Sequence, residues 1–425
     1  MRTVLWFMAL FAVAVASALF AGNNHSTVTV FWAPYRVDLS LNLVLLALAG
    51  LFVTLHIALR TFSGLLKIPQ QARRWRLLQK ERAIHSALLD SLSHLVSGRF
   101  VRARKAAELV VSLEESVGRS GEHLGYEGRL RTISHLLAAE SAHALQDRAV
   151  RDAHFQLALA HADSRDAQDA RDGVQLRAAR WTLDDRDAPA ALQWLDQLPQ
   201  GAARRTVALR LRFKAARLAG QSRVALETVR LLTKHRAFSE VAGKSIAKGL
   251  AIELILSAHD SVQMQRAWDT LDASEQQIPE VALAAAERLL SLGGSVTVAN
   301  QWLLPVWEKM VQRTDALTLP QRIRLARALE HGFGSVGGAP DAAWLTRIET
   351  AQMHNPRDAV LQYLAGVVCM RLKLWGKSQQ MLKQSLSMMQ DPELKREAWR
   401  ALADLAEQRQ DTKAAAEAYR EAAKR

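Results

Sequence analysis

The chain has 425 residues, too many for one compact core, so we expect an extended array or several domains. Lys and Arg outnumber Asp and Glu by 56 to 42, and the net charge of +14 requires an acidic partner such as lipid, protein or nucleic acid. The single cysteine, Cys369, excludes a disulfide framework and a multi-cysteine metal site, and we expect it to be a buried free thiol.

Two apolar runs near the start predict a membrane anchor over residues 1–60. Residues 4–21 carry no charge, and residues 41–59 are almost uninterrupted by polar side chains. Each run approaches the roughly 20 residues that cross a bilayer as a helix. We therefore expect a two-span hairpin whose external linker is formed by residues 22–40.

The linker itself has the pattern of a short extended hairpin. Over residues 28–39, apolar side chains alternate with polar ones on both sides of Ala33 and Pro34. The first apolar run has an alternative interpretation. Residues 16–18 resemble the small-residue cleavage site of a signal peptide, which would be removed from the mature protein.

A basic segment, residues 61–105, follows the second apolar run. Positive charge collects on the cytoplasmic side of a span, so we expect this segment, everything after it and the N-terminus to be cytoplasmic. Aromatic residues are few here, which favours anionic lipid over nucleic acid as the partner. The candidate lipid-facing residues are Arg73, Arg74, Arg76, Lys80 and Arg82.

Residues 106–331 predict a divergent array of helical repeats. Apolar positions recur every three and four residues, and strand-like alternation is absent. Weak echoes of one helix start at Ala153, Ala191 and Ala225, which are 38 and 34 residues apart. This period is typical of helical hairpins stacked in a solenoid.

The clearest repeats lie in residues 341–425. Their small and large residues follow the spacing of a tetratricopeptide repeat, a helix–turn–helix unit of about 34 residues. Small side chains allow the two helices to approach closely, and large ones fill the hairpin. The signature residues of the two copies are Gly366, Trp375, Ser378, Leu382, Trp399, Leu402, Ala403, Ala415, Tyr419 and Ala422.

The motifs that suggest catalysis are weak. Residues 332–337 match G-x-G-x-x-G, but they follow a helical pattern where the dinucleotide fingerprint requires a strand. His135 and His143, like His154 and His161, are about two helical turns apart, so ligation is possible, although solvated helix faces explain them as well. We therefore expect a protein that is not an enzyme and that has no cofactor and no metal site.

The complete layout resembles the HemY family of bacterial inner-membrane proteins. The resemblance is strongest in residues 28–48, and the basic exit at residues 60–82 and the repeats after Pro356 also match. It implies two N-terminal spans, a tetratricopeptide-like cytoplasmic domain and an association with late haem (protoporphyrin) biosynthesis. The resemblance identifies no catalytic residue in this chain. A flavin-dependent protoporphyrinogen oxidase shares the name, and this chain does not resemble that enzyme.

Three functions are compatible with these features. The first is an all-α scaffold, tethered to the inner membrane by two spans, which gathers haem-pathway enzymes and contacts anionic lipid but no nucleic acid. The second is a haem or porphyrin carrier that uses histidine and methionine side chains. The third is a general envelope-assembly scaffold. The repeats favour a scaffold, and only the resemblance to HemY favours a role in haem synthesis.

Overall fold

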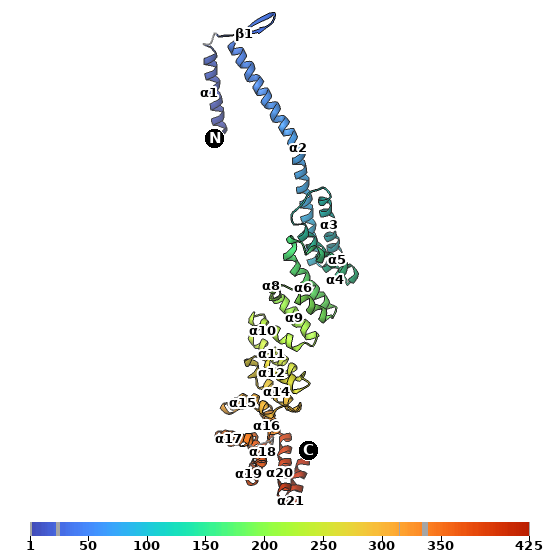
Figure 1. Ribbon diagram of the computed structural model, residues 1–425, viewed down its shortest axis with the longest axis vertical. Helices are drawn as coiled ribbons and strands as arrows, with labels where there is room; N and C mark the ends of the chain where they lie inside the picture. Colours follow the sequence, from blue (N-terminus) through green and yellow to red (C-terminus); the bar gives the residue numbers. More distant parts are fainter. Residues whose placement is uncertain (1, 23–25, 314, 334–338, 425) are drawn as a thin grey trace. The chain divides into compact units, whose positions relative to one another are not determined.

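A computed structural model describes residues 2–22, 26–313, 315–333 and 339–424. For residues 2–5, 20, 21, 62–74 and 339–341 it describes the backbone alone. The chain divides into two compact units, Met1–Arg171 and Asp172–Arg425. Apart from one short strand pair, the regular structure of the described residues is helical (Figure 1). The predicted all-α class is thus confirmed.

The first unit begins with a helix and a β-hairpin. Helix α1 (Arg2–Gly22) precedes strands β1 (Thr27–Trp32) and β2 (Tyr35–Ser40), which pair antiparallel with Trp32 opposite Tyr35. Across the pair, the Thr29 hydroxyl donates a hydrogen bond to Asp38 Oδ1 (2.6 Å). The extended hairpin predicted around Ala33 and Pro34 is confirmed.

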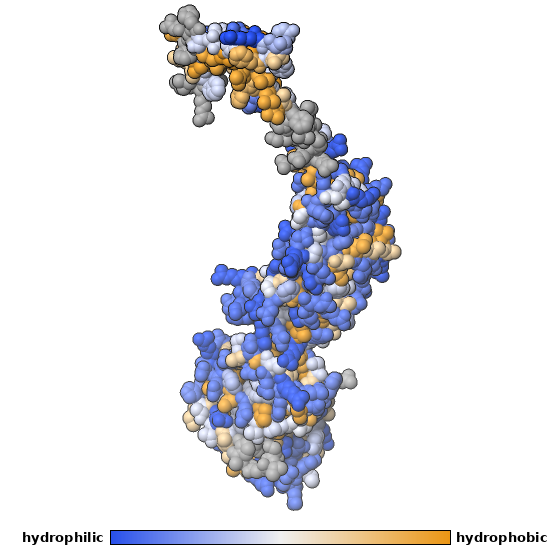
Figure 2. Space-filling model, turned by 45° about the horizontal axis from the view of Figure 1, so that its top comes forward, coloured by the Kyte–Doolittle hydropathy of each residue, from blue (hydrophilic) through white to orange (hydrophobic). Residues whose placement is uncertain are grey.

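Helix α2 (Leu41–Val96) continues for 56 residues from the hairpin into the first repeat. Its first part, Leu41–Thr61, has a mean hydropathy of 2.2 and is not buried in the protein. In the described residues it is the one helix that is long and apolar enough to cross a membrane, since the apolar part of α1, Trp6–Leu19, is shorter. Figure 2 shows hydrophobic residues gathered over this apolar segment.

The rest of the first unit consists of helices packed on the second half of α2. They are α3 (Phe100–Gly118), α4 (Glu127–Ala144) and α5 (Arg148–His161), followed by the short 3-10 helix η1 (Arg165–Ala167). A small core that includes Ile84, Val110 and Leu130 joins α2, α3 and α4. Helix α6 (Gln168–Asp184) begins at the end of this unit and continues into the second.

The second unit is a row of helical hairpins. Its helices are α7 (Ala188–Asp196), α8 (Gln200–Ala203), α9 (Thr206–Leu218), α10 (Ser222–Lys234), α11 (Glu240–Leu256), α12 (Ser261–Asp269), α13 (Ala273–Gln276), α14 (Pro279–Ser291), α15 (Val296–Gln312), α16 (Leu319–Gly332), α17 (Ala339–His354), α18 (Ala359–Arg371), α19 (Trp375–Met388), α20 (Pro392–Gln408) and α21 (Thr412–Ala423). One continuous apolar core extends from Ala216 to Ala418, because each hairpin buries its apolar stripe against the next.

The hairpins share one turn geometry. Each of several turns has a residue with positive φ, for example Gly220 (68°) and Lys373 (61°), which ends the first helix in the left-handed conformation. Five residues after such a turn, the second helix presents a buried small side chain at Ala103, Ala191, Ala225, Ser378 and Ala415. This small residue lets the two helices of a hairpin approach each other.

Candidate functional site

The predicted signature of the penultimate repeat lies at the contact between α18 and α19. A Cβ atom added at Gly366 would come within 2.6 Å of Leu382 Cγ, so this position has room for glycine alone. The Ser378 hydroxyl donates to the Gly366 carbonyl oxygen (2.8 Å). Leu382 is fully buried, and Trp375 packs partly buried against the core.

The signature of the last repeat lies between α20 and α21. Ala403 and Ala415 are buried, as are Leu402 and Ala422, and Trp399 is partly buried against the core. Tyr419 differs, because it is 41% exposed and its hydroxyl donates to Asp404 Oδ1 (3.0 Å) on the neighbouring helix. The signature residues therefore pack the helices of the repeats together, and the surface grooves are lined by other side chains.

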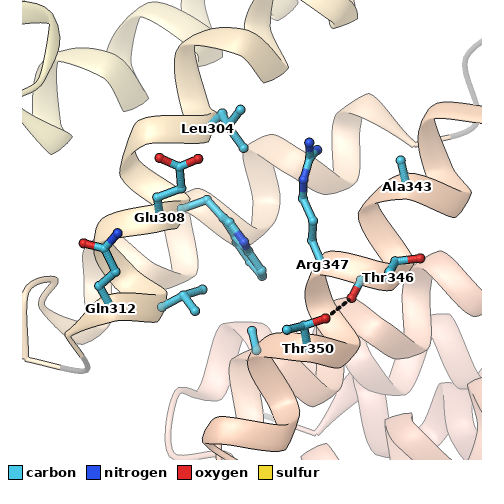
Figure 3. A pocket seen from close by; sticks show the side chains of 10 residues that line it. Leu304, Glu308, Gln312, Ala343, Thr346, Arg347 and Thr350 are labelled. Atoms are coloured by element: carbon cyan, nitrogen blue, oxygen red, sulfur yellow. Dashed lines mark hydrogen bonds between the residues drawn. The ribbon is translucent and has the colours of Figure 1, made fainter.

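A groove of about 580 Å³ lies between α15 and α17 (Figure 3). Trp307 and Val311 of α15 and Ala351 of α17 provide an apolar lining. Glu308 projects from α15 and Arg347 from α17, on the two sides of the opening (Figure 3). An apolar floor between an acidic and a basic wall suits an amphipathic peptide or helix.

Aromatic side chains fix the shape of this groove. The Trp307 and Trp344 rings meet edge to face, with centroids 5.5 Å apart, and the Arg347 guanidinium lies 5.3 Å from the centre of the Trp344 ring. Such contacts orient the arginine without neutralising its charge. Arg347 therefore places a positive charge beside the apolar lining of the groove.

A polar network joins α16, α18 and α20. Arg327 of α16 donates to Glu397 Oε2 (3.1 Å) and Glu393 Oε2 (3.2 Å) of α20, and the Tyr363 hydroxyl of α18 donates to Glu330 Oε2 (2.7 Å). Burial raises the pKa of Glu330. The network lines a second opening of about 350 Å³, where it ties three consecutive repeats together.

In the first unit, three histidines meet between α4 and α5. His135 and His154 share a hydrogen bond between their Nδ1 atoms (3.1 Å), and the His135 and His161 rings stack with centroids 5.8 Å apart. His154 Nε2 lies 3.5 Å from Glu108 Oε1. Burial lowers the pKa of His135 to about 4, so its ring is neutral at pH 7.

The histidine cluster corrects the interpretation of these residues as solvated helix faces. His135 is only 7% exposed, and the neighbouring Arg131 forms a two-pronged ion pair with the buried Glu114 (2.6 and 3.0 Å). The clustering is across two helices, whereas sequence spacing suggested pairs along one helix. Among the described residues, no group of three or more His, Cys, Asp or Glu side chains is arranged to hold a metal ion.

The candidate lipid-facing residues differ in their surroundings. Arg76 and Arg82 are exposed on α2, whereas the Lys80 ammonium donates to the Ser116 carbonyl (3.1 Å) and the Ser120 hydroxyl (3.0 Å) of the first hairpin. Lys80 therefore helps to fasten α3 to α2. The side chains of Arg73 and Arg74 lie outside the described residues.

Two other sequence features are placed by the structure. The glycine motif begins at Gly332, the last residue of α16, and residues 334–338 lie outside the described part of the chain. Cys369 is a fully buried free thiol, as predicted, and burial raises its pKa.

The fold and these openings define a class of protein, a helical-hairpin repeat protein with an N-terminal helix of membrane-spanning length. A model of the HemY protein N-terminus matches residues 26–146, which include the β-hairpin, that helix, α3 and α4. The expected resemblance to the HemY family is thus confirmed over residues 26–146. No curated protein matches the chain.

Several solved structures resemble the chain weakly. They include the APC/C hetero-tetramer Cut9-Hcn1 (14% identity, TM-score 0.29), Naa15/Naa10 bound to HypK-THB (12%, 0.24) and the P58(IPK) TPR domain (14%, 0.22). The matches cover 80%, 77% and 77% of this chain. They cover 66%, 57% and 99% of those chains, so this chain spans less than two thirds of the first two. Similarity at this level assigns neither a partner nor a function.

Proposed function

We propose that this protein is a non-enzymatic scaffold, tethered to the inner membrane, which gathers enzymes of late haem (protoporphyrin) biosynthesis. The observation that carries the proposal is the match of residues 26–146 to the HemY N-terminus, in a chain built of stacked hairpins. Stacked hairpins present extended surfaces that hold peptides, helices or whole proteins. The groove between α15 and α17 offers one such surface.

The proposed topology has two spans, with residues 22–40 outside and both termini in the cytoplasm. The charge asymmetry around Leu41–Thr61 supports it, because basic residues follow the span and almost none precede it. Reporter fusions within residues 22–40 and after Arg82 should report opposite compartments. A periplasmic signal from the fusion after Arg82 would contradict this topology.

The partner proposal is tested by purification of the full chain from gently solubilised membranes, followed by identification of the bound proteins. Haem-pathway enzymes should be enriched, and Trp307→Ala, which removes the floor of the α15–α17 groove, should reduce their recovery. Recovery of envelope-assembly proteins instead would favour a general scaffold.

A carrier of haem or porphyrin is the alternative, and the histidine cluster is the observation in its favour. Burial keeps His135 neutral, the form in which an imidazole ligates iron. Its Nδ1 is already engaged by His154, however, and its ring is covered by His161. We therefore expect no stoichiometric Soret shift on haem titration of the chain, and unchanged function when His135, His143, His154 and His161 are replaced by alanine. A saturable one-to-one shift that these substitutions abolish would establish the carrier.

A further inference from the structure

Helix α2 has two apolar faces, and only one of them is covered. The first, which includes Ile84, Ala87 and Leu88, packs into the cores shared with α3 and α4. The second remains exposed over five turns of the helix. Its apolar residues and their exposed fractions are Trp75 (61%), Leu78 (52%), Leu89 (66%), Leu92 (39%) and Val96 (88%).

The second face has the spacing of a helix–helix seam. Together with Arg82 and His85, its apolar residues are separated alternately by three and four positions, from 75 to 96. Apolar residues with this heptad spacing form the contact line between paired helices. We refer to residues 75, 78, 82, 85, 89, 92 and 96 as the α2 seam.

The α2 seam lies on the side of the helix away from α3. The Ser91 hydroxyl donates to the Ala103 carbonyl of α3 (3.0 Å), and Lys80 also contacts α3. At about 100° per residue, Ser91 lies about 160° and Lys80 about 180° around the helix from Leu89. On one side, a polar, exposed strip that includes Gln79 and Asp90 separates the seam from the buried face. On the other side Leu88 and Leu95 are half-buried, and the His85 ring stacks on Tyr126 with the centroids 6.1 Å apart.

The charge within the seam is positive, and two carboxylates flank it: Glu81, which accepts a hydrogen bond from the Tyr126 hydroxyl (2.8 Å), and the exposed Asp90. Arg82 lies within the seam, and Arg99 and Arg102 stand just beyond its end at Val96, where they line a depression of about 480 Å³. In the described part of the chain, none of these three arginines forms an ion pair. Exposed leucines between unpaired arginines complement an apolar stripe flanked by carboxylates.

We propose that the α2 seam binds an acidic amphipathic helix of a partner protein. This inference deepens the scaffold function and rests on it. A second copy of the chain fits poorly, because parallel pairing through the same seam places Arg82 against Arg82 and His85 against His85 at core positions. A partner helix with a carboxylate opposite Arg82 pairs this charge and covers the leucines.

The test uses the full chain in phosphatidylcholine nanodiscs and a fluorescent designed peptide of about three heptads. The peptide has leucine at the core positions, glutamate at the flanking positions and glutamate opposite Arg82. A control peptide has lysine at the flanking positions. Binding is measured by fluorescence anisotropy, and sedimentation reports the oligomeric state of the nanodisc-held chain.

The acidic peptide should bind, and Leu89→Ser/Val96→Ser should weaken binding by about tenfold or more, because these are the two most exposed apolar side chains of the seam. Gln79→Ser/Asp90→Ser, on the polar strip, is the matched control and should leave the affinity unchanged. Arg82→Glu should weaken binding, and a peptide with arginine opposite that position should restore it. These exposed substitutions leave the buried face of α2 intact.

Equal binding of the acidic and lysine peptides, or unchanged affinity of the Leu89→Ser/Val96→Ser variant, would overturn the proposal. Two other results would also overturn it. If the chain self-associates and the Leu89→Ser/Val96→Ser variant does not, the seam binds a second copy. If the chain binds added phosphatidylserine vesicles and this variant does not, the seam binds a membrane. Enzyme capture separates the two proposals. If the Leu89→Ser/Val96→Ser variant still recovers haem-pathway enzymes, only the proposal about the α2 seam is refuted. If the chain binds the peptide but recovers no such enzyme, only the proposed scaffold function is refuted.

Discussion

Replacement of Gly366 by alanine should destabilise the hairpin of α18 and α19, although alanine favours helices. A Cβ at this position lies 2.6 Å from Leu382 Cγ and 2.8 Å from Leu382 Cδ2, so the leucine or the helix must move. Such overpacking costs about 1–3 kcal/mol. The gain in helix propensity offsets about 0.5–1 kcal/mol of this.

Gly249 provides the matched control, because it lies inside α11 with nothing within 4 Å of an added Cβ. Gly249→Ala should therefore stabilise the chain by the propensity term alone, about 0.5–1 kcal/mol. The difference between the two variants isolates the packing cost, about 1–3 kcal/mol.

Urea denaturation of the full chain, with hydrogen exchange of the α18 and α19 amides, measures this difference locally, since repeat arrays unfold in parts. In a double variant with Leu382→Ala the effect of Gly366→Ala should shrink, because the clash is removed. Stabilisation by Gly366→Ala equal to that by Gly249→Ala would refute the close approach of the two helices.

Three further predictions concern other parts of the chain. Ala415→Trp should destabilise the last hairpin by about 1–3 kcal/mol, because a buried small residue is overpacked; an unchanged melting curve would contradict the repeat assignment. His135 has a pKa of about 4 in the folded state and about 6.5 in the unfolded chain, so the free energy of unfolding should fall by about 3 kcal/mol as the pH drops from the second value to the first. His135→Gln should make the free energy of unfolding, measured with urea, less dependent on pH over that range. Replacement of Arg73, Arg74 and Arg76 by glutamine should weaken binding of the nanodisc-held chain to anionic vesicles, more so at low salt; equal binding would leave these residues as a topology signal.

The sequence predicts the hairpin period wherever the position five residues after the turn holds a small side chain. Ala191 and Ala225 are both buried five residues after a left-handed turn, as their spacing suggested. The echo at Ala153 was wrong by two residues, because Ala153 is exposed and the position five residues after the turn at Gln146 belongs to Arg151. An arginine is buried there, and no pattern of small residues can reveal it.

The surfaces were harder to foresee than the framework. The histidine cluster joins His135 to His154 and His161 across two helices, a contact set by the packing of α4 on α5 and not by spacing along either. The groove beside Trp307 depends on how α17 is placed beside α15, which the sequence of neither helix determines. The second apolar face of α2 follows a heptad spacing from residue 75 to residue 96, whereas the positive charge of residues 61–105 predicted only a contact with lipid.

The continuity of α2 has a consequence for the position of a bound partner. Between Thr61, where the apolar segment ends, and Leu77, the first residue that packs on the repeats, the helix rises about 24 Å at 1.5 Å per residue. In a membrane-anchored chain, the length of this segment sets the distance between the bilayer and the first hairpin. A partner bound to the first hairpin would then be held at about this distance from the end of the apolar segment.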